Sequence, residues 1–286
     1  MAFTSIQGLL DAARDIPLWQ AIQADDCSDR GVSPQASFDK MVTLWTAMKA
    51  SVCSYDPTRR SASGLVGGDG GKMSQAEDTL CGPFLQSVMS TALKVGECNA
   101  CMGRIVAAPT AGSSGVMPAV LLPYQERWKV SDEEMVKALF VAAGFGQVIA
   151  ARASISGAEG GCQAEVGSAS AMAAAALVHL RGGTPQQMAA ACATAIQNLL
   201  GLVCDPVGGL VEVPCIKRNV IGAVGAMAAA DLALAGIENV IPCDEVIDAM
   251  GAVGRALPCT LRETGEGGLA VTPTARRLTE NIFAKG

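Results

Sequence analysis

The segment SDEEMVKALFVAAGFGQVIAARAS, residues 131–154, decides the fold class of this chain. Its first four residues have the pattern of a helix capping box, and the apolar residues that follow predict a long helix. Alanine and glycine fill much of that helix, so its surface would let neighbouring helices approach closely. The segment therefore predicts a mainly α-helical protein.

The same signals recur along the chain. Residues 184–187 form a second capping-box pattern, and Ser33-Pro34 places proline at the first position of another predicted helix. Strand-like runs are few and short, and no internal repeat is present. We expect one large helical domain over residues 1–286, in which residues 1–60 form an N-terminal helical region. The predicted helices cover residues 33–52, 135–154, 163–180, 188–203, 218–235 and 243–256.

Composition and charge exclude several classes of protein. The net charge is −6 and the pI is about 4.9, and no basic run is long enough to neutralise a nucleic-acid backbone. The longest uncharged runs, 105–125 and 182–204, contain Pro, Gly and polar residues throughout, so we predict no membrane span. Eleven cysteines in an acidic chain without a basic leader are typical of reduced thiols, and we expect a cytoplasmic protein.

Four glycine-rich stretches interrupt the predicted helices, at residues 63–72, 108–115, 156–162 and 204–215. Each of them alone is typical of a helix end or connection. Glycine permits close backbone approach and exposes N–H groups, so four such stretches together indicate backbone amides collected around a site.

The side chains available for chemistry are mainly thiols. His179 is the single histidine and ends an apolar helix, where we predict a C-terminal cap, so Ser-His-Asp catalysis and histidine-based zinc sites are disfavoured. Cys98 and Cys101 form a CxxC pair, but no second pair completes a zinc site. We interpret that pair as packed thiols, and Cys192, within an alanine-rich helix, as a core residue.

Cys162, Cys204 and Cys215 differ from the other cysteines because each lies at a break in the predicted helices. Cys162 follows two glycines, Cys204 precedes an Asp-Pro pair, and Cys215 follows a proline. Loop thiolates can accept hydrogen bonds from neighbouring amides, which is typical of iron–sulfur ligands. The spacing of the three matches no ferredoxin pattern, so the residues alone leave both a cluster site and plain core thiols open.

Longer segments resemble a known family, the α chains of iron–sulfur-dependent L-serine dehydratases. They are NACMGRIVAAPTAGSSGVMPAVLL (99–122), EGGCQAEVGSASAMAAAAL (159–177) and CDPVGGLVEVPCIKRN (204–219), with shorter likenesses at 63–72 and 265–278. The resemblance covers the chain from about residue 60 onward. It implies a cytoplasmic lyase that deaminates L-serine to pyruvate and ammonia. It also implies a [4Fe–4S] cluster bound by Cys162, Cys204 and Cys215.

The resemblance implies roles for further residues. Three cysteine ligands would leave one iron open to bind the substrate hydroxyl and ease its departure. Lys217 and Arg218 would tune the charge of the cluster, and the general base is left open. The substrate carboxylate is expected on the segment that holds Asn99, Arg104, Thr110, Ala111, Gly112 and Ser113.

The resemblance is closest to the two-chain form of the family. It implies a separate β chain and a hetero-oligomer, because the family's SSHT-type motif and tail cysteine are absent from these 286 residues. Neither a nucleic acid nor a membrane is expected as a partner.

Three other interpretations stay open. One is a related lyase of the same fold that acts on L-cysteine and releases sulfide. Another is a pyridoxal-phosphate dehydratase with Lys217 as the Schiff-base lysine, although that fold needs alternating strands and helices. The last is a non-catalytic helical scaffold. An absorbance spectrum would separate the iron–sulfur serine enzyme from the pyridoxal-phosphate dehydratase, and iron and sulfide analysis would test the scaffold.

Overall fold

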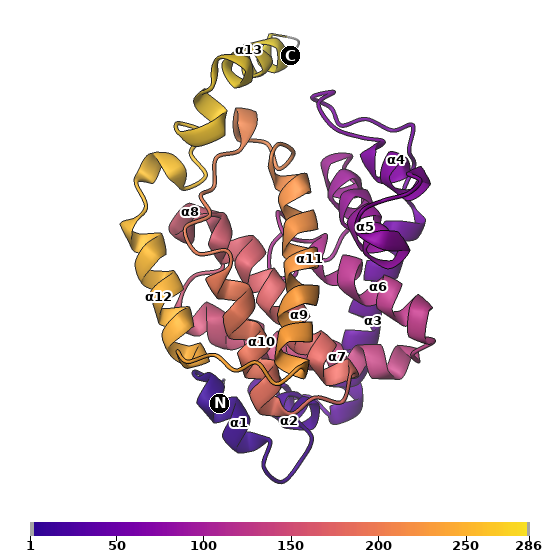
Figure 1. The fold of residues 1–286 in the computed structure, drawn as a ribbon, viewed down its shortest axis with the longest axis vertical. Helices are drawn as coiled ribbons and strands as arrows, with labels where there is room; N and C mark the ends of the chain where they lie inside the picture. Colours follow the sequence, from indigo (N-terminus) through magenta and orange to yellow (C-terminus); the bar gives the residue numbers. More distant parts are fainter. Residues whose placement is uncertain (1–2, 285–286) are drawn as a thin grey trace.

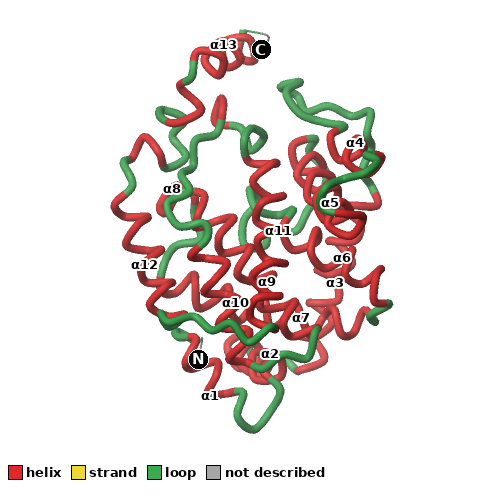
Figure 2. The backbone as a smooth tube through the Cα atoms, viewed as in Figure 1, coloured by secondary structure: helices red, strands yellow, loops and turns green. Residues whose placement is uncertain are grey.

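The computed structural model describes residues 3–284 and confirms the mainly α-helical fold class. The backbone in this range consists of helices and loops (Figure 2), and no β-strand is assigned within it. A single isolated bridge between Cys204 and Arg262 is the nearest approach to β structure. The alternating strands and helices that a pyridoxal-phosphate dehydratase of the expected fold would need are therefore absent from residues 3–284.

The longer connections between consecutive helices in the first half of the chain are residues 54–68 and 101–115. In the first half of the chain the helices are α1 Ile6–Ala12, α2 Leu18–Arg30, α3 Pro34–Cys53, α4 Asp69–Gln75, α5 Gly82–Ala100, α6 Val116–Trp128 and α7 Asp132–Arg152. In the second half they are α8 Gly157–Gly160, the π-helix η1 Gln163–Gly167, α9 Ser168–Leu180, α10 Pro185–Gln197, the 3₁₀ turn η2 Val207–Gly209, α11 Cys215–Leu234, α12 Cys243–Ala256, the 3₁₀ turns η3 Cys259–Leu261 and η4 Gly268–Val271, and α13 Pro273–Phe283.

Most predicted helix positions are confirmed, and two differ in detail. The helix predicted over 188–203 ends at Gln197, because the chain turns there and Gly201 takes a left-handed conformation with φ of 83°. The helix predicted over 163–180 begins as the π-helix η1 and becomes α-helical at Ser168.

The two predicted capping boxes have different outcomes. At α10 both bonds of the box are present, from Gln187 N to Thr184 Oγ1 and from Thr184 N to Gln187 Oε1. At α7 the Ser131 side chain accepts from Glu134 N, while the Glu134 carboxylate pairs with Lys137 at 2.6 Å instead of turning back. The helix start is predicted correctly there, but the reciprocal bond is replaced by an ion pair within one turn.

The core of the protein surrounds α9. Residues 168–178 of α9 are buried, and the helix packs against α10, α7, α11 and α6 (Figure 1). Alanine occupies much of this surface, which lets four neighbours pack closely around one helix. Among the described residues, α7 is long and apolar enough to cross a membrane, but 61% of its most apolar window is buried within the protein. It behaves as a core helix between α9, α2 and α3.

The helix arrangement brings the three loop cysteines to one region. Cys162 immediately precedes η1 and α9, Cys215 begins α11, and Cys204 lies in the connection between α10 and α11. Because α9, α10 and α11 pack against one another, these segments are held at a fixed separation. Figure 1 shows α13 at one end of the molecule and α1 with α2 at the other, and α13 packs against η2 and η4.

Candidate functional site

The candidate site is built around Cys162, Cys204 and Cys215, all of which are buried. Gly161 precedes the first of them with φ of 74°, a left-handed conformation that favours glycine and reverses the chain before η1. Cys162 and Cys204 pack in one buried cluster with Val166. Cys162 and Cys215 raise the pKa of Cys204, and Cys162 raises that of Cys215, so the three thiols lie near one another.

Burial dominates the protonation of these thiols. It raises the pKa of Cys162 to about 11 and that of Cys215 to about 12, and it raises the pKa of Cys204 further still. The Glu165 carboxylate adds to all three increases, and Arg218 opposes them at Cys162 and Cys215. The thiols are therefore protonated at neutral pH in the chain alone, and a bound cationic group would be needed to stabilise the thiolates.

Arg218 on α11 is the cation of the site. Its guanidinium pairs with the buried Asp205 at 2.8 Å, donates to Val203 O at 2.7 Å and lies beside the Cys162 thiol. Asp205 also accepts from Leu269 N at 2.7 Å, so this pair joins α11, the 204–215 loop and η4. Lys217, the other cation expected to tune the site, is exposed.

Glu165 in the π-helix η1 is the carboxylate of the site. It accepts a hydrogen bond from Thr110 Oγ1 at 2.7 Å, and burial raises its pKa. Sequence reasoning did not select Glu165, although a signal was present: it is the only charged residue between Glu159 and His179. A π-helical turn in an otherwise α-helical segment is itself frequent at functional sites.

Two glycines allow other loops to approach the Glu165 carboxylate closely. A Cβ atom on Gly112 would lie 3.1 Å from Glu165 Oε1. A Cβ atom on Gly157 would lie 2.8 Å from Glu165 Oε2 and 3.1 Å from Cys204 Sγ. The 108–115 loop, the 156–162 segment and Cys204 therefore meet at Glu165.

The 108–115 loop is fixed to α11 by Asn219, a second residue that sequence reasoning did not select. Asn219 Nδ2 donates to Gly112 O at 2.7 Å and to Cys215 O at 2.9 Å, and its Oδ1 accepts from Gly115 N at 2.9 Å. This buried side chain thus connects the loop expected to bind the substrate with one of the three cysteines.

The predicted substrate residues divide into two groups. Thr110 and Ser113 have their hydroxyl oxygens 3.1 Å apart beside Glu165, Gly112 lies against the same carboxylate, and Ala111 is exposed. The neighbouring Ser114 Oγ is buried and has no hydrogen-bond partner in residues 3–284.

Asn99 and Arg104 are not joined to this group. Asn99 is half-buried near the end of α5, and Arg104 is exposed. Within residues 3–284, neither side chain is hydrogen-bonded to Thr110, to Glu165 or to a loop cysteine.

The glycine-rich stretch 63–72 directs its amides to a carboxylate of the chain itself. Asp69 N and Gly70 N donate to the buried Glu97 at 2.7 and 3.2 Å, and Tyr55 Oη donates to it at 2.7 Å. Burial and this bond raise the pKa of Tyr55 to about 12. These two amides are therefore structural, contrary to the expectation that all four stretches present amides to a ligand. Ser63 Oγ reaches the site indirectly by donating to Glu212 of the 204–215 loop.

Three of the remaining thiols and the histidine have surroundings typical of packed residues, whereas Cys53, Cys81 and Cys259 are exposed. Cys98 and Cys101 are buried at the end of α5, and Cys98 Sγ lies 3.9 Å from Arg104 O. Cys192 is fully buried in α10 and hydrogen-bonds with Cys243, which confirms the prediction of a core residue. His179 lies in the last turn of α9, where burial lowers its pKa and favours the neutral ring.

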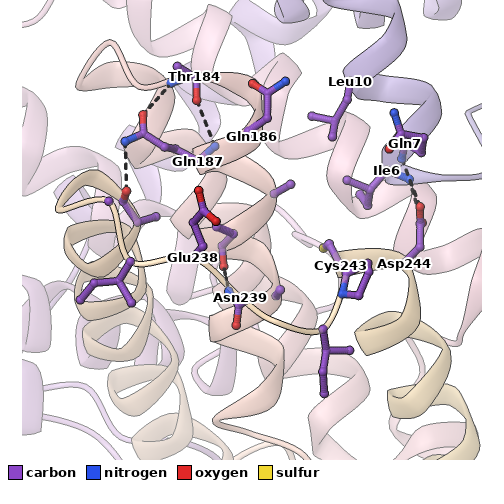
Figure 3. A pocket seen from close by; sticks show the side chains of 18 residues that line it. Ile6, Gln7, Leu10, Thr184, Gln186, Gln187, Glu238, Asn239, Cys243 and Asp244 are labelled. Carbon is purple, nitrogen blue, oxygen red and sulfur yellow. Dashed lines mark hydrogen bonds between the residues drawn. The ribbon is translucent and has the colours of Figure 1, made fainter.

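A separate cavity of about 590 Å³ lies away from the three cysteines (Figure 3). It is bounded by α1, α10 and the connection from α11 to α12, with Glu238 and Cys243 among its lining residues. Within residues 3–284, no three His, Cys, Asp or Glu side chains are arranged to hold one metal ion. Cys162, Cys204 and Cys215 are not among the residues that line this cavity.

Comparison with known proteins identifies the relatives of this chain. Residues 13–270 match the model of the family described as serine dehydratase alpha chain. The probable L-serine dehydratase, alpha chain, of Bacillus subtilis (strain 168) is 53% identical over 86% of this chain and 83% of its own length. The corresponding protein of Latilactobacillus sakei is 56% identical over 71% of this chain and 97% of its own. L-serine dehydratase 2 of Escherichia coli (strain K12) is 47% identical over 63% of this chain, but only 40% of its own length is matched.

Proposed function

Because this chain belongs to the serine dehydratase alpha chain family, we propose that it is the α chain of an enzyme that deaminates L-serine to pyruvate and ammonia. The relatives named as L-serine dehydratases support a lyase-type dehydratase. We propose further that Cys162, Cys204 and Cys215 hold a [4Fe–4S] cluster. The observation that carries this proposal is that three buried thiols, one before η1 and two at the ends of the 204–215 segment, lie near one another.

The thiols fit such a cluster in chemistry and in placement. Because their pKa values are raised, these thiols would lose their protons only to a strongly cationic group, and iron would be such a group. The cysteines of a [4Fe–4S] cluster bind separate irons, so they need not converge as the ligands of one ion do. Arg218 beside Cys162 would offset the negative charge of the thiolates.

The chain's own residues would then position the substrate. When bound, a cluster with three protein ligands supplies one Lewis-acidic iron for the leaving hydroxyl group. The Ser113 hydroxyl, the unpartnered Ser114 Oγ and the amides of residues 111–113 are donors suited to a carboxylate, while the Thr110 hydroxyl donates its proton to Glu165. Gly112 and Gly157 let their loops approach the Glu165 carboxylate closely because neither carries a side chain.

The glycine-rich stretches support this arrangement in unequal ways. The 108–115 and 156–162 segments meet at Glu165 and Cys204, and the 204–215 segment carries two of the cysteines. The 63–72 segment is connected to the 204–215 loop through the bond between Ser63 and Glu212. We propose that the first three surround the cluster and that the fourth supports them from outside.

We propose that a separate β chain completes the enzyme. The relatives named as alpha chains imply an assembly of more than one kind of chain, and the Escherichia coli relative extends well beyond the part matched here.

We propose a cytoplasmic location as well. None of the eleven cysteines forms a disulfide in residues 3–284, which supports a reducing compartment such as the cytoplasm.

The test is anaerobic co-expression of this chain with a candidate β chain, followed by iron, sulfide and activity measurements. We expect about four irons and four sulfides for each α chain, and pyruvate and ammonia in equal amounts from L-serine. Full activity in protein that contains no iron would contradict the cluster. Sulfide release from L-cysteine at a higher kcat/KM than turnover of L-serine would favour the L-cysteine lyase instead.

A further inference from the structure

Glu165 is a half-buried carboxylate for which residues 3–284 provide no cationic partner. Of the hydrogen bonds in this range, it accepts the one from Thr110 Oγ1. No Lys or Arg in this range forms an ion pair with it, although Arg218 is engaged nearby with Asp205. Burial is the largest cause that raises its pKa, Glu263 adds to the increase, and the bond from Thr110 opposes it.

An uncompensated carboxylate in such a place is costly unless a ligand pairs with it. An ionised carboxylate can accept about four hydrogen bonds, and Glu165 uses one of them on Thr110. Burial of a charge without a partner destabilises the folded protein, so the position favours a bound cation. The arrangement thus has unused acceptors and unpaired negative charge at the same point.

The neighbours of Glu165 restrict the kind of cation. Thr110, which donates to Glu165, belongs to the loop whose hydroxyls and amides suit a carboxylate. On its other side, the glycine approach at residue 157 brings Glu165 Oε2 near Cys204 Sγ. A cation that also carries a carboxylate would use both Glu165 and the donors of this loop, and an α-amino acid has its ammonium and carboxylate on the same carbon atom.

We propose that Glu165 binds the α-ammonium group of the substrate. This inference rests on the proposed function and adds the residue that distinguishes an amino acid from a hydroxy acid. Glu165 is then a substrate-binding residue that holds the ammonium, while Thr110 fixes the orientation of the Glu165 carboxylate.

The test compares two ligands that cannot be turned over as L-serine is. L-Alanine keeps the ammonium and carboxylate but lacks the hydroxyl, and 3-hydroxypropanoate keeps the hydroxyl and carboxylate but lacks the ammonium. In the anaerobic α–β enzyme, Glu165→Gln should weaken the binding of L-alanine by about tenfold or more, as expected for a lost hydrogen bond to a charged group. The binding of 3-hydroxypropanoate should stay within about twofold or become tighter, because a nearby negative charge has been removed.

Equilibrium dialysis measures both ligands without catalysis. The matched control is Glu159→Gln, the same change on an exposed side chain six positions earlier in the chain. Iron content and thermal unfolding must match between the two variants. If Glu165→Gln does not fold or load iron, Glu165→Asp keeps the charge and withdraws it by one methylene group, and a smaller loss confined to L-alanine is expected.

The outcomes separate this inference from the proposed function. A wild-type α–β enzyme that does not turn over L-serine would overturn the proposed function. If the wild type is active and Glu165→Gln binds L-alanine as the wild type does, the ammonium assignment is overturned alone. Loss of turnover with unchanged L-alanine binding would also overturn it, and would place Glu165 in the chemical step. Equal weakening of both ligands would overturn it by showing general damage to the site.

Discussion

Replacement of Asn219 by alanine should separate the substrate loop from the cysteine region. The side chain is buried and forms three hydrogen bonds, from Gly115 N and to the carbonyl oxygens of Gly112 and Cys215. Asn219→Ala removes all three while keeping a residue that favours the helix. The Gly115 N–H and the Gly112 carbonyl are loop groups, and both lose the partner that Asn219 provides.

The size of the effect follows from these two groups. A buried polar group left without a partner costs about 1–3 kcal/mol, so two such groups give about 2–6 kcal/mol. Water that enters the vacated space would recover part of this, and we expect a loss of about 2–4 kcal/mol in the free energy of unfolding. For a protein of this size, each kcal/mol lowers Tm by about 2–4 °C, so Tm should fall by about 4–16 °C.

The assay pairs thermal unfolding with iron content, and the control is Asn239→Ala. Asn239 Nδ2 also donates two hydrogen bonds, to Ala190 O at 2.7 Å and Thr194 Oγ1 at 2.8 Å, but it lies on the connection from α11 to α12. Both variants should unfold at lower temperature. Only Asn219→Ala should lose iron and L-serine turnover at temperatures where the protein is still folded, because only that variant frees the 108–115 loop.

A wild-type Tm and a wild-type iron content in Asn219→Ala would refute this reasoning. Such a result would mean that the 108–115 loop is held against α11 by packing rather than by these hydrogen bonds. A lower Tm with full iron and full activity would refute the link to the site while leaving the stability estimate intact.

Four further predictions test the proposed site. Single Cys→Ser changes at the three loop cysteines should abolish iron binding and activity, whereas Cys192→Ser and Cys98→Ser should retain both; normal iron content in a loop-cysteine variant would remove that residue as a ligand. Arg218→Gln leaves Asp205 buried without its cation and should cost about 3–5 kcal/mol in unfolding by denaturant, and an unchanged midpoint would contradict this. Gly157→Ala places a methyl group 2.8 Å from Glu165 Oε2 and should lower iron content, whereas Gly225→Ala, whose methyl group would lie 3.8 Å from Ser170 Oγ, should not. Air should abolish L-serine turnover before the far-ultraviolet circular dichroism changes, and loss of both together would show that the cluster is needed for folding itself.

Local signals explain why the fold was predictable from the sequence. The helix caps at Ser33 and Thr184, and the apolar periodicity of the helices that follow them, depend on residues a few positions apart. The error at the end of α10 has the same origin, because the apolar residues 199–203 continue the helical pattern while the chain turns at Gly201. A sequence pattern could not predict that Glu134 forms an ion pair instead of the second capping bond, since Ser131 and Lys137 both lie three positions from it.

The site was predictable only where it depends on breaks in the chain. The three loop cysteines stand out because glycine or proline adjoins each of them. Glu165, Asn219 and the pair of Asp205 with Arg218 do not stand out in this way. Glu165 meets Thr110 across 55 positions and Asn219 meets Gly112 across 107, so these contacts exist only once the helices have packed. Asn99 and Arg104 lie close in sequence to the 108–115 loop, but their side chains are not hydrogen-bonded to Thr110 or Glu165.

The packing of α9 is therefore part of the site rather than only its support. Cys162 precedes α9 and Cys215 begins α11, so the distance between these helices sets the separation of two thiols. Small alanine side chains and the bond from Ser170 Oγ to Gly222 O, 2.8 Å long, hold the two helices together. Since core damage on α9 would also displace the thiols, iron loss alone does not identify a ligand. Cys192→Ser makes the same atomic change in the adjacent core helix α10, and iron retained there but lost at Cys162 would distinguish a ligand from a packing residue.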